Sequence, residues 1–102
     1  MKLKKYRIYD DKLKKYYYFD LSSSYGMIPI DLRGKEEEFT GLQDINGVDI
    51  YENDIMVNDS AHYEMRVVWE KGVYLLKDER FPNSIPYYLH EVGKTLYVKN
   101  NL

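Results

Sequence analysis

The chain alternates short apolar and polar runs with clusters of turn residues along most of its 102 residues. In LKKYRIYD (residues 3–10) this alternation puts Tyr6 and Ile8 on one face, which predicts a strand with that face toward the core. DDKLKK then predicts a turn whose Asp side chains accept backbone N–H groups. YYYFDL predicts the returning strand, so residues 3–19 are expected to form a β-hairpin. A helix is the alternative, but four consecutive aromatic residues show no 3.6-residue stripe.

The segment after this hairpin carries weaker patterns. SSSYG (22–26) predicts a loop. MIPIDL (27–32) predicts a short extended piece, which Pro29 confines to a sheet edge or to a position outside a sheet. RGKEEEF (33–39) predicts a turn with one short helical turn of glutamates. Residues 1–38 are therefore expected to form a hairpin followed by a variable loop.

Two turn signals lie close together in FTGLQDINGVDIYENDIMV (39–57). Asn46-Gly47 stands between two apolar runs and accepts the positive φ angles of a type I′ turn, which predicts a second hairpin. A further turn is expected at 51–54, with Asn53 in the left-handed conformation and Asp54 stabilising the turn. Ile55 to Val57 then begins the next strand.

The last part of the chain predicts one more hairpin and a long loop. Residues 63–70 and 73–77 flank Lys71-Gly72 and read as paired strands. Residues 78–88 form a loop with two prolines, and 88–92 and 95–98 are expected to be short final strands. The core candidates of the hairpin are its large apolar residues, Val68, Trp69, Val73, Leu75 and Leu76.

Repeated short strands with Gly and Asn turns predict a mainly β fold, a small antiparallel SH3-like barrel or roll with an N-terminal β-hairpin and little helix. Composition agrees, because the chain has twelve tyrosines, which favour strands, and a single alanine, the best helix former. The length is that of one domain, 1–102, in which we distinguish the hairpin and variable loop (1–38) from the barrel portion (39–102).

Charge is spread unevenly along the chain. The formal net charge is −2, yet residues 1–16 carry +5 and residues 31–54 carry −6. The near-neutral total argues against a dedicated duplex-DNA binder. The asymmetry predicts either a local basic patch or pairing between the two segments within the fold.

The sequence offers little for catalysis or metal binding. There is no cysteine. A calcium loop that begins at Asp44 needs glycine sixth and glutamate twelfth, but Gly47 is fourth and Ile55 twelfth. Asp49, Glu52 and Asp54 lack the Gly-rich phosphate loop that accompanies many magnesium sites. His62 and His90 stand alone, and no nucleophile elbow supports a triad built on Ser22–Ser24. We expect no enzyme activity, no cofactor and no metal.

Two stretches are candidate binding surfaces. Aromatic residues interleaved with Lys on the N-terminal hairpin can stack the bases of single strands, although the same lysines also protect an edge strand from aggregation, which is the preferred interpretation. The loop after residue 77 is too apolar to be a plain solvated loop, so it either packs down on the barrel or presents anchors to a partner. The candidate partner-binding residues are Lys12, Lys14, Lys15, Tyr16, Tyr17, Tyr18, Phe81, Ile85, Tyr87 and Tyr88.

The stretch FTGLQDINGVDIYENDIM resembles the signature of the YopX family of bacteriophage and prophage proteins, which reads approximately FTGL-x-D-x-NG-x-xIYEGDI[VI]. The turn residues Asn46, Gly47 and Asp54 match this signature, and Asn53 replaces its usual glycine. KYRIYD and EVGKTLYVKN are similar, more weakly, to the opening and the close of family members. Residues 26–38 and the loop after Lys77 align with nothing in the family, so a specialised function is expected there.

The resemblance implies a phage or prophage origin and an SH3-like barrel, and it transfers no catalytic residue. We expect a small non-enzymatic accessory protein that binds and inhibits a host protein, such as a counter-defence (anti-CRISPR or similar) factor in the cytoplasm of a bacterial host. The alternative is a nucleotide- or nucleic-acid-binding module that uses the basic, Tyr-rich hairpin. No membrane association is expected, because no apolar run approaches the ~18 residues of a membrane span. A homo-oligomer is compatible with both functions.

Overall fold

The computed structural model describes residues 4–20, 28, 30–58 and 64–99. These residues are mainly β, with antiparallel strand pairs, short 3-10 turns and one α-helical turn. This confirms the predicted mainly β, antiparallel fold with little helix. The chain separates into two compact units, Met1–Phe39 and Thr40–Leu102. The SH3-like detail and the single domain stay predictions, and Ser22–Ser24, Pro29 and His62 lie outside the described residues.

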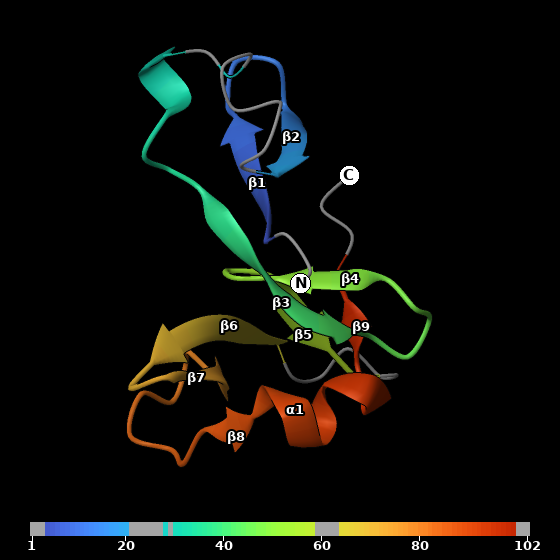
Figure 1. The fold of residues 1–102 in the computed structure, drawn as a ribbon. Helices are drawn as coiled ribbons and strands as arrows, with labels where there is room; N and C mark the ends of the chain where they lie inside the picture. The colour runs from blue at the N-terminus through green and yellow to red at the C-terminus, as the bar shows by residue number, and fades with distance from the viewer. Residues whose placement is uncertain (1–3, 21–27, 29, 59–63, 100–102) are drawn as a thin grey trace. The chain divides into compact units, whose positions relative to one another are not determined.

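The first unit contains the predicted N-terminal hairpin (Figure 1). Strands β1 (Lys5–Asp10) and β2 (Lys15–Asp20) pair antiparallel, with Ile8 opposite Tyr17. The Asp10 side chain forms the predicted cap, because its Oδ1 accepts the backbone N–H groups of Lys12 and Leu13 at 2.9 and 3.2 Å. The face of Tyr6 and Ile8 does point to the core, where Ile8 is fully buried.

Two predictions for residues 27–38 are wrong. Ile30–Leu32 is a 3-10 turn (η2) rather than an extended piece, since this turn buries Leu32 in the cluster of Ile8 and Phe19. The glutamates form no helical turn. Glu37 and Glu38 begin β3 (Glu37–Gln43), where they pair with β1. Glu37 is ion-paired with Arg7 of β1, and Glu38 with Lys4, which directly precedes β1. The predicted pairing between the basic and acidic segments therefore occurs.

In the second unit, the strands surround one apolar cluster (Figure 1). In one sheet the strand order is β8-β7-β6-β5-β9. The other sheet has the order β2-β1-β3-β4, so β4 is hydrogen-bonded to β3. Val67, Leu76 and Met56 are fully buried at its centre, with Leu89 and Ile50 beside them. The elements are β4 (Asp49–Tyr51), β5 (Ile55–Val57), β6 (Glu64–Glu70), β7 (Val73–Lys77), β8 (Tyr87–Tyr88), α1 (Leu89–Val92), η3 (Gly93–Thr95) and β9 (Tyr97–Val98).

The hairpin loop between β3 and β4 is held by the carboxylate of Asp44, which is 7% exposed. Its Oδ1 accepts the N–H groups of Asn46 and Val48 at 2.8 and 2.9 Å, and its Oδ2 accepts Val98 N–H at 2.9 Å. The predicted type I′ turn is wrong. Gly47 has a φ of +78°, but Asn46 does not have a positive φ, and Gly47 N–H donates to Asp44 C=O across a longer loop.

The type I′ pattern of backbone angles occurs instead in the next hairpin. Lys71 and Gly72 both have positive φ, at 51° and 85°, between the paired residues Glu70 and Val73. Of the five residues predicted to form the core of this hairpin, only Leu76 is buried. Apolar residues occupy both faces of these strands, and the buried ones are Met65 and Val67, while Trp69 is half-exposed.

The turn after β4 agrees with the prediction, since Asn53 has a φ of +71°. The Oδ2 atom of Asp54 accepts the N–H of Tyr51 at 2.8 Å, and Asp54 is 3% exposed. The backbone of the turn also pairs with β6: Asn53 N–H donates to Val67 C=O, and Val67 N–H donates to Asp54 C=O, both at 2.9 Å. The carboxylate therefore fixes a turn that is itself part of the sheet.

The predicted strand at 88–92 is mostly helix. Only Tyr87–Tyr88 pairs with β7, and Leu89–Val92 then turns as α1. The turn buries Leu89, and it brings Gly93 so close that a Cβ there would lie 3.0 Å from Leu89 Cδ1. Of the predicted strand at 95–98, Tyr97–Val98 pairs with β5, whereas Thr95 ends a 3-10 turn.

We predict that Asp44→Ala lowers the free energy of unfolding by about 2–4 kcal/mol, because three backbone N–H groups lose a shared acceptor in a largely buried position. Urea denaturation followed by circular dichroism measures the loss. Asp49→Ala in the same hairpin is the matched control and should cost less than about 1 kcal/mol, since its hydrogen bond with Gln43 is exposed. Equal losses in the two variants would contradict the prediction.

Candidate functional site

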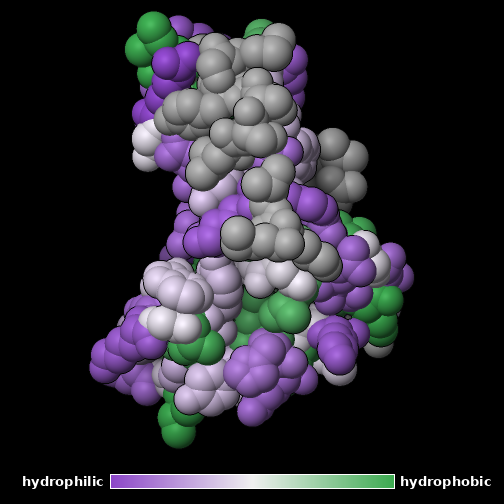
Figure 2. Space-filling model, viewed as in Figure 1, coloured by the Kyte–Doolittle hydropathy of each residue, from purple (hydrophilic) through white to green (hydrophobic). Residues whose placement is uncertain are grey.

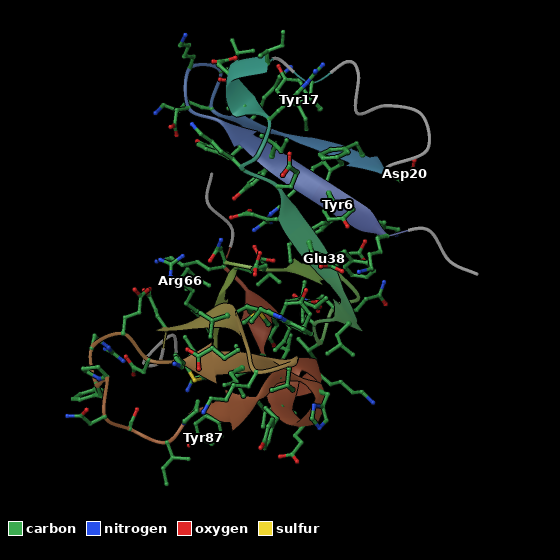
Figure 3. The ribbon with its side chains drawn as sticks, turned by 60° about the vertical axis from the view of Figure 1, so that its left-hand side comes forward. Tyr6, Tyr17, Asp20, Glu38, Arg66 and Tyr87 are labelled. Atoms are coloured by element: carbon green, nitrogen blue, oxygen red, sulfur yellow. The ribbon has the colours of Figure 1, made fainter. Side chains whose placement is uncertain are left out.

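The structure divides the three consecutive tyrosines of β2 between two faces. Tyr17 packs against the apolar cluster of the first unit, and its hydroxyl lies 3.5 Å from Asp10 Oδ2. Tyr16 and Tyr18 lie on the opposite face, where Tyr16 is directly opposite Tyr9 of β1. Figure 3 labels Tyr6 and Tyr17 on the two strands of this hairpin. The candidate surface therefore includes Tyr9 and excludes Tyr17.

Tyr9, Tyr16 and Tyr18 form a continuous row, which we call the tyrosine row. The ring centroids of Tyr9 and Tyr16 are 4.9 Å apart, and those of Tyr16 and Tyr18 are 6.0 Å apart. Tyr18 is 62% exposed and Tyr9 39%. The Arg7 guanidinium lies 4.3 Å from the centroid of the Tyr16 ring, in a cation–π arrangement. The row is therefore an aromatic surface that is open to solvent at both ends.

Ion pairs reduce the positive charge of the hairpin. Arg7 Nε lies 2.7 Å from Glu37 Oε1, with both side chains largely buried, and Lys4 Nζ lies 3.4 Å from Glu38 Oε1. Lys15 lies over the ring of Tyr17. Within the part of the chain that the structure describes, Lys12 and Lys14 are exposed at the tip and form no ion pair. Of the predicted cations, these two keep the most freedom to meet a ligand.

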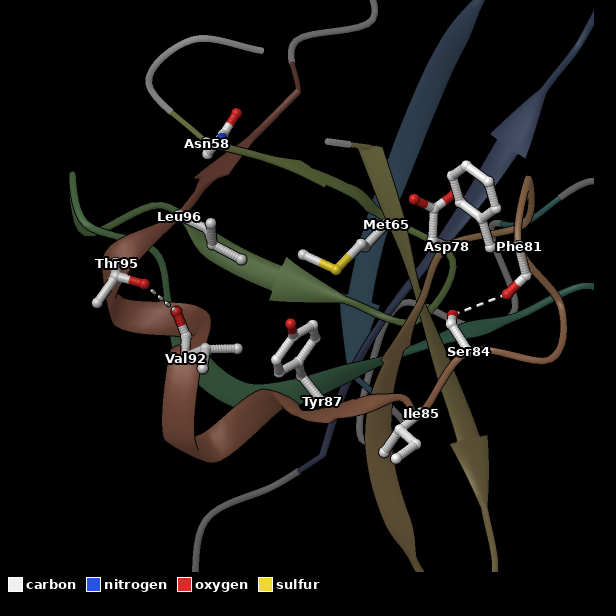
Figure 4. Close-up of a pocket in the computed structure, with 10 residues that line it drawn as sticks. All are labelled: Asn58, Met65, Asp78, Phe81, Ser84, Ile85, Tyr87, Val92, Thr95 and Leu96. Atoms are coloured by element: carbon white, nitrogen blue, oxygen red, sulfur yellow. Dashed lines mark hydrogen bonds between the residues drawn. The ribbon is translucent and has the colours of Figure 1, made fainter. Parts of the chain in front are cut away.

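A pocket of about 410 Å³ in the second unit brings together the predicted apolar loop and part of the core (Figure 4). Its floor includes Met65 and Leu96, which belong to the central cluster. In Figure 4 these two side chains and that of Tyr87 point toward one another. The full lining is Asn58, Met65, Asp78, Phe81, Ser84, Ile85, Tyr87, Val92, Thr95 and Leu96.

The loop residues at the pocket are strongly exposed. Phe81, Ile85 and Tyr87 are 60%, 89% and 58% exposed, although each has a large apolar body. Tyr88 is also exposed, but it lines no part of the pocket, and its ring centroid lies 5.4 Å from that of His90. On the face seen in Figure 2, hydrophobic residues form separate spots in a mainly hydrophilic surface. The three loop residues thus give the pocket an apolar rim.

Hydrogen bonds within the loop order its backbone. Asp78 Oδ1 accepts the N–H of Arg80 at 3.0 Å, Phe81 N–H donates to Asp78 C=O at 3.0 Å, and Ser84 N–H donates to Phe81 C=O at 2.9 Å. Successive turns of this kind fix the direction of the chain. Phe81 is therefore held by turn hydrogen bonds, Ile85 directly follows the last of these turns at Ser84, and Tyr87 is held by pairing with Leu76 of β7.

The polar groups of the pocket are engaged by the chain itself. The hydroxyls of Ser84 and Thr95 donate to the carbonyls of Phe81 and Val92, each at 2.7 Å. The side-chain hydrogen bonds from Arg80 hold the pKa of Asp78 below its ordinary value of 3.8. Asp78 is therefore ionised at neutral pH and bonded to its own cation, so it is poorly suited to act as a general base.

Within residues 4–20, 28, 30–58 and 64–99, no group of three or more His, Cys, Asp or Glu side chains is placed to hold a metal ion. The same described residues contain no helix that is long and apolar enough to cross a membrane. Ser22–Ser24 and His62, which were not expected to form a catalytic triad, lie outside these residues.

Sequence reasoning missed most of the pocket. Met65, Val92 and Leu96 reach it from separate strands and turns, and only folding brings them beside the loop. The one local signal was the set of large apolar residues on either side of the two prolines of the loop. That signal identified Phe81, Ile85 and Tyr87, which form the rim, but not the floor.

These features define a small antiparallel β protein with an apolar pocket on one unit and an aromatic row on the other. The family model described as YopX protein matches residues 32–98, and the chain belongs to the YopX family. No curated protein matches the sequence. The matched span begins after the hairpin with the tyrosine row and contains every residue that lines the pocket. Because it runs through residues 32–38 and the loop after Lys77, the expectation that these segments align with nothing in the family is wrong.

We predict that Arg80→Gln raises the pKa of Asp78 toward 3.8, because the guanidinium is the main cause of its lowering. In the wild type, the stabilisation from this pair is present above the unfolded-state pKa and is lost as the pH falls through the lower folded-state pKa. An NMR titration of the carboxyl carbon measures the shift. Arg66→Gln, which removes the ion pair with Glu79, should leave the Asp78 pKa unchanged. An equal shift in both variants would refute the assignment.

Proposed function

We propose that this YopX protein is a non-enzymatic accessory protein that binds a host protein and inhibits it through the pocket beside residues 78–88. The observation that carries the proposal is an apolar floor of core residues, Met65 and Leu96, beneath the exposed rim of Phe81, Ile85 and Tyr87. Exposed apolar groups around a concavity are typical of sites where a partner inserts an anchor side chain.

The order of the loop supports protein binding. A partner that meets a pre-ordered rim does not have to immobilise it, so less of the interaction free energy is lost to ordering. The pocket volume of about 410 Å³ lies in the range of 300–1,000 Å³ typical of binding pockets. We therefore expect the partner to contribute one or two large apolar side chains.

The chemistry of the pocket favours binding over catalysis. The hydroxyls of Ser84 and Thr95 donate to backbone carbonyls, and the carboxylate of Asp78 accepts hydrogen bonds from Arg80. Such groups shape and orient a ligand, whereas a nucleophile needs an adjacent base to activate it. A non-enzymatic role is therefore part of the proposal.

The expected target follows from the origin of the protein. The YopX resemblance implies a phage or prophage source, and small phage accessory proteins often act on the host's restriction, CRISPR or nucleotide-signalling defences. We therefore propose a counter-defence role, in which the protein occupies a surface that the host component needs for its own activity.

We predict that Ile85→Glu abolishes capture of the host partner, because the charge is placed on the apolar rim. Pull-down from a bacterial host lysate, with the stoichiometry of each captured protein measured, gives the first readout. Ile30→Glu is the matched control: Ile30 is 80% exposed and Ile85 89%, and Ile30 lies on the first unit. A partner is accepted only if the wild type and Ile30→Glu retain it and Ile85→Glu loses it.

With the partner purified, calorimetry should show that Phe81→Ala weakens binding by about 2 kcal/mol, roughly 30-fold. Inhibition of the partner should follow the occupancy measured in the same titrations. The proposal is wrong if no stoichiometric partner is found and expression changes neither phage growth nor defence. It is also wrong if Ile85→Glu binds the partner as the wild type does.

A further inference from the structure

We propose that the tyrosine row, Tyr9, Tyr16 and Tyr18, is a stacking surface for the bases of single-stranded nucleic acid, independent of the pocket. The three rings lie on one face of the β1–β2 hairpin, opposite the face that buries Ile8 and Phe19. Base–aromatic stacking tolerates any sequence, since every base has a π-face. The chemical class of the ligand is therefore a single strand of DNA or RNA.

The exposed rings suit bases that are not paired. The rings contact one another, with centroids 4.9 and 6.0 Å apart and planes tilted by 59° and 41°, so a base can meet only their solvent-facing sides. In a duplex the faces of the bases are covered by their neighbours, whereas the bases of a flexible single strand can turn out to meet a ring. The row therefore predicts a preference for single strands over duplex.

The composition of this face favours a base over a protein partner. Its described members are Lys5, Arg7, Tyr9, Tyr16, Tyr18, Asp20, Glu37 and Phe39, which include aromatic and charged residues but no aliphatic one. The rim of the pocket, by contrast, includes Ile85. Exposed aromatic rings with a guanidinium over one of them are suited to stacking, to which Arg contributes through cation–π contact.

Charge limits how many phosphates the hairpin contacts. Arg7 is ion-paired with Glu37 and Lys4 with Glu38, so these cations are already partly neutralised. Lys12 and Lys14 at the tip form no ion pair among the described residues. Two phosphate contacts give a slope of log K against log salt of about −1.4 for single strands. Binding should thus depend on stacking more than on charge.

The test uses fluorescein-labelled oligomers of thymidine and of uridine, about 12 nucleotides long, and a duplex of the same length. Fluorescence anisotropy with the full chain is measured at several salt concentrations from about 20 mM upward. We expect both single strands to bind more tightly than the duplex, with a shallow salt slope. The thymidine and uridine oligomers distinguish a DNA ligand from an RNA ligand.

The decisive variants change the exposed rings and the tip. Tyr18→Ala should weaken binding by about 5- to 150-fold, the range measured for loss of one stacked base, while Tyr18→Phe should bind as the wild type does. The double substitution Lys12→Gln, Lys14→Gln should remove most of the salt dependence. Circular dichroism verifies the fold, which Tyr18 variants should keep because this side chain is 62% exposed.

Cross-controls separate this proposal from the proposed function. Tyr87→Ala, at the pocket, should leave oligomer binding unchanged, and Tyr18→Ala should leave capture of the host partner unchanged. The stacking proposal is overturned if neither single strand binds at the lowest salt or if duplex binds equally well. It is also overturned if Tyr18→Ala binds as the wild type does, or if a host protein needs Tyr18. None of these outcomes affects the role of Ile85.

Discussion

The second unit depends on a buried carboxylate that accepts hydrogen bonds from three backbone N–H groups at once. Asp44 directly follows β3. Its side chain closes the hairpin loop by accepting the N–H groups of Asn46 and Val48, and it also accepts the N–H of Val98 in β9. Residues 54 positions apart therefore share one acceptor. The neighbouring Ile45 N–H donates to Leu96 C=O at 3.0 Å, which fixes the residue before β9 that also forms part of the pocket floor. An acidic residue whose spacing fits no calcium loop thus organises the fold through backbone hydrogen bonds.

Strands and turns could be predicted because their signals are local. The hairpins at 5–20 and 64–77 follow from the alternation of apolar and polar residues and from the turn residues between the strands. Asn53, a residue type that tolerates the left-handed conformation, has the expected positive φ. The buried face of the hairpin at 64–77 could not be predicted, because Val67-Val68 and Leu75-Leu76 place an apolar residue on each face of the two strands. Helix at Leu89 depends on burial in a distant cluster, which the local sequence does not show. The pocket floor likewise comes from separate segments, so only its rim had a local signal.

Two kinds of exposed apolar surface result, and each is supported by a different constraint. At the rim of the pocket, backbone turns that begin at Asp78 fix Phe81, and pairing with β7 fixes Tyr87. The tyrosine row is fixed by strand pairing, together with the ion pair between Arg7 and Glu37, which orients the guanidinium over Tyr16. The family match covers the first surface and not the second. The two surfaces therefore need not have been selected for the same task.

The backbone turns of the 78–84 loop have a consequence for how such a protein changes over generations. The Asp78 cap and the turn hydrogen bonds at Phe81 and Ser84 use mainly main-chain atoms, while the side chains of Phe81 and Ile85 contribute little to the core. Mutations at these rim positions can accumulate at small cost to folding. The side chains that this loop presents to solvent can therefore be replaced one by one, while the main-chain hydrogen bonds that order it stay in place.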